Sequence, residues 1–159
     1  MQRQNFTTTY QSTVVRERVV VSLQKFGGLA ISVDETNTVI IFECIARHFD
    51  TLLKLLDLYH SYPDVELFVI TIFKDLIKNQ CFDDLQAQHH QFLYKTVHNL
   101  IGIYAKNEVG RHRKANDSEE EELFEDLSIL FQLLSELILS EYDGFGNIFF
   151  RPFHLDMHI

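Results

Sequence analysis

The stretch from Asp50 to Ser61 reads DTLLKLLDLYHS, and its polar residues recur at steps of three and four. That spacing puts polar side chains on one side of an α-helix and leaves a wide apolar face on the other. The polar stripe consists of Asp50, Lys54, Asp57 and Ser61, and the apolar face of Leu52, Leu53, Leu55, Leu56 and Tyr59. The stretch therefore predicts an amphipathic helix whose apolar face is covered by other helices.

The same spacing continues in the segment that Pro63 opens, since proline is tolerated in the first turn of a helix. We expect this segment and the helix over 50–61 to form a tight antiparallel hairpin. The predicted buried residues are Val65, Phe68, Val69, Ile72, Phe73 and Leu76, and the predicted exposed residues are Asp64, Thr71, Asp75 and Lys78.

Two further helices are predicted, one from about Ala87 to Lys106 and one from Ser118 to about Tyr142. The start of the second is marked by Ser118 and Glu121, which form a capping-box pattern. Their predicted buried residues are Leu93, Val97, Leu100, Ile101 and Tyr104 in the first, and Leu123, Leu127, Leu130, Leu134 and Leu137 in the second.

The first third of the chain is ambiguous, because the β-branched runs 19–21 and 38–42 also suit buried strands. Helical spacing decides the interpretation, with Val15, Val19, Leu23 and Phe26 in one run and Phe42, Ile45 and Phe49 in the other. We expect the second run to continue without a break into the helix at Asp50. The pair Gly27-Gly28 is expected to bend or end the first helix.

A short internal repeat links two of the predicted helices. The run 55–59, LLDLY, returns as LIGIY at 100–104, which is an offset of 45 residues from Tyr59 to Tyr104. HEAT repeats have periods of about 40 to 47 residues. Each match is expected to close the first helix of a pair. The predicted fold is an all-α, HEAT-like solenoid of antiparallel helix pairs over residues 1–143, followed by an irregular tail at 144–159.

Composition narrows the possible partners. The formal charge of -9 disfavours binding to nucleic acid or to an anionic membrane. No run approaches the ~18 apolar residues of a membrane span, so we expect no membrane insertion. Cys44 and Cys81 form no CxxC pair, which favours a reducing, intracellular compartment.

The sequence gives only weak signals for a metal-binding or catalytic site. The spacing of His60, His89, His90 and His98 favours solvent-facing or capping roles over metal ligation. Because no catalytic or nucleotide-binding motif is present, we expect neither enzymatic activity nor a cofactor. Two charged runs have more than one interpretation. The acidic residues at 117–126 suit a solvated helix start better than a docking patch for a basic partner. The basic run 111–114 suits an interhelix loop better than an anion-binding patch or a nuclear-localisation signal.

One motif carries a family resemblance. It runs Tyr104-x-Lys106-Asn107-x-x-Gly110-Arg111-x-Arg113, and it is followed by the acidic run 119–122 and the Leu-rich segment to Tyr142. Weaker similarity reaches back through 55–63 and 26–30, so that it covers about residues 12–143. The chain resembles nuclear export receptors of the importin-β (karyopherin) superfamily.

The resemblance implies a large HEAT-repeat receptor that binds the small GTPase Ran in its GTP form together with cargo proteins such as translation initiation factor 5A. Such a receptor contacts nuclear pore components and is found in nucleus and cytoplasm. It is several times longer than 159 residues, so the chain is expected to be a segment whose apolar ends self-associate. The alternative is a HEAT- or armadillo-type interaction scaffold without Ran dependence. The resemblance assigns no Ran or cargo contact to any residue here.

Overall fold

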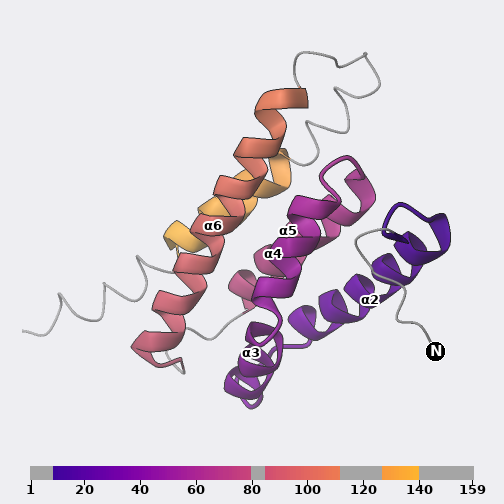
Figure 1. Cartoon of the computed structure of the whole chain (residues 1–159). Coiled ribbons are helices and arrows are strands. Elements are labelled where there is room, and N and C mark those ends of the chain that lie inside the picture. Colours follow the sequence, from indigo (N-terminus) through magenta and orange to yellow (C-terminus); the bar gives the residue numbers. More distant parts are fainter. Residues whose placement is uncertain (1–8, 80–84, 112–126, 140–159) are drawn as a thin grey trace, which may run out of the picture.

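The computed structural model describes residues 9–79, 85–111 and 127–139, and the regular structure within these ranges is α-helical (Figure 1). The helices are α2 (Thr13–Ile31), α3 (Thr38–Ala46), α4 (Phe49–Leu58), α5 (Pro63–Asn79) and α6 (Ala87–Arg111), with a further helix at 127–139. The predicted all-α class is confirmed. Both β-branched runs, 19–21 and 38–42, lie in helices over these ranges.

The glycine pair does not end α2, which continues past Gly28 to Ile31. The helix closes where the Ser32 amide donates to the carbonyls of Gly28 and Leu29, at 3.2 and 3.1 Å. Neither glycine has a positive φ. The helix therefore continues through Gly27 and Gly28, although the conformational freedom of glycine would allow it to bend or end there.

The expected continuity between 42 and 50 is wrong, because α3 ends at Ala46 and α4 begins at Phe49. At the break the His48 amide donates to the Ile45 carbonyl at 2.9 Å. A straight helix would separate residues 42 and 49 by about 10 Å along its axis. The break instead brings the rings of Phe42 and Phe49 edge to face, with centroids 6.0 Å apart, and buries both.

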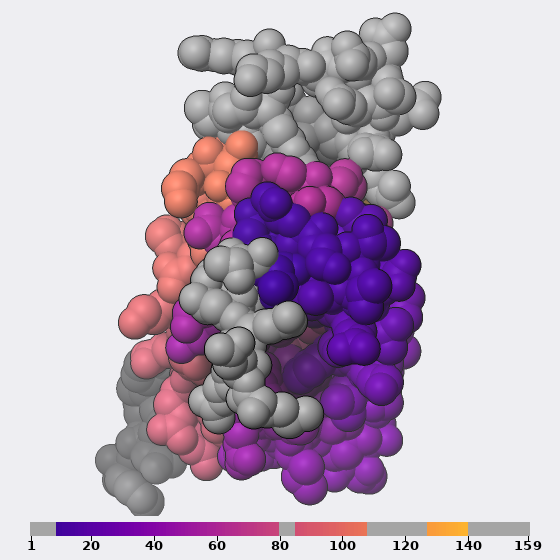
Figure 2. Space-filling model, turned by 45° about the vertical axis from the view of Figure 1, so that its right-hand side comes forward, coloured from indigo at the N-terminus to yellow at the C-terminus, as the bar shows by residue number. Residues whose placement is uncertain are grey.

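Each helix packs against particular neighbouring helices. Helix α5 packs against α2 and α4, α4 also packs against α6, and α2 packs against α3. The predicted pairing of 50–61 with 63–79 is confirmed, since α4 and α5 are in contact and only residues 59–62 join them. The close packing of α2 on α5 was not anticipated. Helices α2 and α3 form one side of the molecule (Figure 2).

The hydrophobic core is formed by the faces on which these neighbouring helices pack. It contains most of the predicted buried residues: Leu52, Leu53, Leu56, Tyr59, Val65, Val69, Ile72, Phe73, Leu76, Leu93, Val97, Leu100, Tyr104 and Leu130. Leu55, Phe68 and Ile101 are only half-buried. Two residues of α5 that were expected outside, Thr71 and Asp75, are half-buried, because α5 packs on both α2 and α4.

Tyr59 and Tyr104, the matching residues of the internal repeat, are alike in burial but differ in their position relative to the end of the helix. Both side chains are buried. Tyr59 directly follows α4, whereas Tyr104 lies inside α6, which continues to Arg111. Ser61 and Pro63 follow Tyr59 and favour a turn and a new helix start, and Tyr104 is followed by neither.

Several predictions fall beyond the described ranges. Of the helix expected from Ser118 to Tyr142 the structure describes 127–139, where Leu130 and Leu133 are buried and Leu127, Leu134 and Leu137 are half-buried. Leu123, the Ser118 capping box, the run 112–126 and the tail 144–159 lie outside the described residues.

Replacing Gly27 with Ala is expected to raise the free energy of unfolding by about 0.5 to 1 kcal/mol, because alanine restricts the unfolded chain and favours helix. A Cβ at Gly27 would meet nothing within 4 Å. Gly102→Ala in α6 is the matched variant, with the same open space. Urea titration measures both. A loss of stability in Gly27→Ala alone would show that α2 needs a bend there.

Candidate functional site

The histidines that the sequence singled out do not lie together. Within residues 9–79, 85–111 and 127–139 no three His, Cys, Asp or Glu side chains are grouped to hold a metal ion. His60 Nδ1 lies 2.8 Å from the Asp57 carbonyl at the end of α4. His98 is exposed on α6, and His89 packs its ring on Phe42 with centroids 5.2 Å apart.

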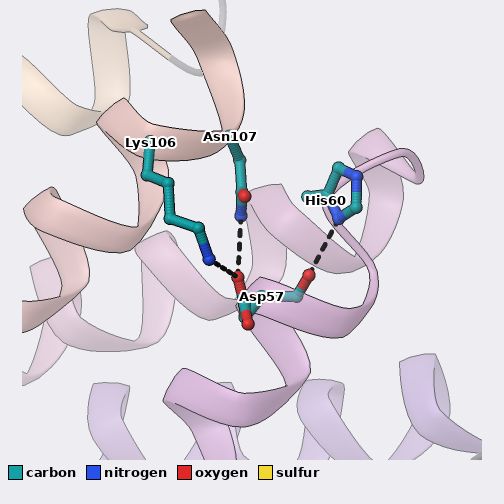
Figure 3. Close-up of polar contacts among 4 residues, drawn as sticks. All are labelled: Asp57, His60, Lys106 and Asn107. Atoms are coloured by element: carbon teal, nitrogen blue, oxygen red, sulfur yellow. Dashed lines mark hydrogen bonds and ion pairs between the residues drawn. The ribbon is translucent and has the colours of Figure 1, made fainter. Parts of the chain in front are cut away.

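A polar cluster joins the end of α4 to α6 (Figure 3). Lys106 Nζ and Asn107 Nδ2 reach the same Asp57 oxygen, Oδ1, at 3.4 and 3.3 Å. Lys106 and Asp57 are 72% and 49% exposed, so this ion pair contributes little to stability. The cluster links the surfaces of the two helices where they are in contact.

This cluster gives a structural role to part of the resemblance motif. Tyr104 is buried, and Lys106 and Asn107 contact α4, so these three positions serve the packing of α6 on α4. Nothing in the sequence pairs Asp57 with residues about fifty positions away. The contact becomes visible only once α4 and α6 are neighbours.

A second cluster surrounds Tyr59. Its hydroxyl donates to the Tyr10 carbonyl at 2.9 Å, and its ring contacts those of Tyr10 and Tyr62 edge to face. The Arg16 guanidinium lies 4.8 Å from the centre of the Tyr62 ring, and its Nε is 3.7 Å from an Asp64 oxygen. Burial raises the pKa of Tyr59 above its usual value. The cluster ties the chain before α2 to the turn between α4 and α5.

Tyr59→Phe is expected to cost about 1 kcal/mol of unfolding free energy, because it removes one hydrogen bond and leaves the Tyr10 carbonyl without that donor. The raised pKa keeps the Tyr59 hydroxyl protonated in the fold. Wild-type stability therefore falls as pH rises above about 10, where the unfolded tyrosine ionises. Tyr59→Phe should lose less on this rise. Denaturant titrations at pH 7 and above 10 measure both effects, with Tyr62→Phe as control.

An open cup lies between α3, the first turn of α4 and the first turns of α6. It has a volume of about 460 Å³ and is lined by Phe42, Glu43, Ala46, Arg47, Asp50, His89 and Phe92. Its apolar lining is Phe42, Ala46 and Phe92, and the rings of Phe42 and Phe92 both contact the buried ring of Phe49, at 6.0 and 5.4 Å between centroids. Sequence reasoning missed the cup because three separate helices supply its walls.

The cup combines an apolar floor with charges that are not paired to each other. No salt bridge joins Glu43, Arg47 and Asp50, all of which are exposed. His89 Nδ1 is buried and has no hydrogen-bond partner among the described residues. An open, aromatic-floored hollow with charges at its rim suits contact with a side chain of another protein.

Within the described ranges no helix is long and apolar enough to cross a membrane. No known protein-family model matches this sequence.

Proposed function

We propose that this chain is a protein-binding stack of helix pairs of the HEAT type. One observation carries the proposal: α4 lies beside α6, α2 lies beside α5, and a short turn joins α4 to α5. In a solenoid of helix pairs, the first helices of successive repeats lie side by side in one row and the second helices in another. The 45-residue offset from Tyr59 to Tyr104 relates α4 and α6, which are in contact, and this supports the same repeat.

The specific function we propose is that of a segment of a nuclear export receptor similar to exportin-4 in the karyopherin superfamily. The support is the motif from Tyr104 to Arg113 on an all-helical fold. In such a receptor Ran in its GTP form and a cargo such as translation initiation factor 5A bind the same solenoid. Each raises the affinity for the other when both favour one curvature.

Ran dependence tests this function. In the full-length receptor, retention on immobilised Ran is expected to be at least about tenfold stronger with a non-hydrolysable GTP analogue than with GDP, a difference of about 1.4 kcal/mol. Added cargo should strengthen the GTP-dependent retention further. Equal retention on both forms would contradict the export function.

The alternative is an interaction scaffold without Ran dependence, and one observation favours it. Lys106 and Asn107 of the motif contact Asp57 of α4, so that part of the resemblance concerns helix packing. A scaffold of this kind would bind its partner equally in the presence of either nucleotide.

A further inference from the structure

The cup between α3, α4 and α6 carries two carboxylates that are not paired within the described part of the chain. Glu43 lies on α3 and Asp50 in the first turn of α4, both side chains line the cup, and both are exposed. The salt bridges among the described residues join other groups, and none of them includes Arg47. Both carboxylates are therefore available to a cation from another molecule.

The ring of Phe92 adds a flat apolar surface on the α6 side of the cup. Phe92 is 44% exposed, although its ring also packs on the buried ring of Phe49. The cation that lies over an aromatic ring within the described residues is Arg16, and it covers Tyr62. The face of an aromatic ring attracts a cation, and a planar guanidinium also stacks on it.

Charges of both signs lie around the cup, and their balance favours a cation. A carboxylate would be attracted by Arg47 and by the first turns of α4 and α6, whose free amide groups carry partial positive charge. It would be repelled by Glu43 and Asp50, and Asp50 already offsets the start of α4. The charge of -9 on the whole chain also attracts basic partners.

Arginine fits this combination better than lysine does. Its guanidinium is planar and carries five N–H donors in a fixed fork, so that one face can stack on a ring while the edge pairs with carboxylates. Lysine offers a compact ammonium without such a face. A volume of about 460 Å³ is large enough for one long side chain.

We propose that the cup binds an arginine side chain of a partner protein. Its guanidinium stacks on Phe92 and pairs with Glu43 and Asp50, and its aliphatic stem packs on Phe42 and Ala46. The inference names the partner chemistry of one site on the protein-binding stack proposed above, and it rests on that proposal. It does not depend on Ran.

Titration of the isotope-labelled chain with short peptides, followed by NMR, tests the inference. The probes are a capped Gly-Arg-Gly peptide and the same peptide with lysine or glutamate at its centre. The arginine peptide should shift amide signals around the cup and bind at least about threefold more tightly than the lysine peptide. It should bind at least about tenfold more tightly than the glutamate peptide, which the two carboxylates repel.

Variants of the cup assign the contact to named side chains. The double variant Glu43→Gln/Asp50→Asn keeps the shape of both side chains and should weaken binding of the arginine peptide at least about fivefold. Phe92→Leu keeps an apolar side chain without a ring and should weaken it at least about threefold. Arg47→Gln should strengthen it about twofold, because it removes a like charge from the rim.

A charge-matched control separates the cup from the overall negative charge. The double variant Glu17→Gln/Glu35→Gln removes the same charge from exposed positions outside the cup and should change binding by less than about twofold. Circular dichroism checks that each variant keeps the helical content of wild type. If Phe92→Leu fails this check, the double variant of Glu43 and Asp50 tests the proposal without it.

Three results would overturn the proposal. The first is an arginine peptide that shifts no signals around the cup. The second is an equal loss of binding in the cup double variant and in the control, since the peptide would then respond only to net charge. The third is tighter binding of the glutamate peptide that Arg47→Gln abolishes, because the cup would then take a carboxylate. Ran dependence is measured on the full-length receptor with immobilised Ran, so either proposal can fail without the other.

Discussion

Replacing Phe49 with Ala is expected to lower the free energy of unfolding by about 3 to 5 kcal/mol, among the largest effects of any single truncation in this chain. Phe49 begins α4 and is almost fully buried. Its ring lies within 6.0 Å, between centroids, of the rings of Phe42, Phe73 and Phe92. One substitution therefore leaves a cavity where α3, α5 and α6 converge on α4.

Thermal and urea unfolding of Phe49→Ala measure the effect. Ile40→Ala is the matched control, because Ile40 is exposed on α3 and its truncation should change stability by less than about 0.5 kcal/mol. Phe49→Leu should recover part of the loss by filling some of the cavity. If Phe49→Ala cost no more than Ile40→Ala, Phe49 would not be the residue that joins these helices.

Leu100→Ala is expected to cost about 2 to 5 kcal/mol for the same reason. Leu100 is fully buried at the centre of α6, the helix that packs on α4. His98→Ala, on the exposed side of the same helix, is the control and should be close to neutral. Urea unfolding compares the two variants. Equal effects would mean that α6 does not pack on α4 through the Leu100 side.

The helix pair over residues 49–79 was the part of the fold most predictable from sequence. The polar stripes of 50–61 and 63–79 show which side of each helix is buried, because a helix that packs on one or two neighbours keeps its charges on the remaining surface. Arg47 and His48 gave no such signal. The helix break at these two residues, which brings the Phe42 and Phe49 rings together, was therefore missed.

The candidate sites were less predictable, because each is formed by residues from separate helices. The cup takes walls from α3, α4 and α6, and the Asp57 cluster joins residues about fifty positions apart. Helix α2 illustrates the converse. Val14, Val21 and Leu29 are apolar, yet the packing of α2 on α3 and α5 leaves them exposed.

The central claim is that the helices form a stack in which each helix depends on its neighbours. Native-state amide hydrogen exchange on Leu100→Ala tests it most directly, because exchange reports the opening free energy of each helix separately. A stack predicts that protection falls in α6 and at 127–139 and stays near wild type in α2 and α5. An equal fall in protection across α2, α4, α5 and α6 would contradict the stack and indicate one cooperative bundle.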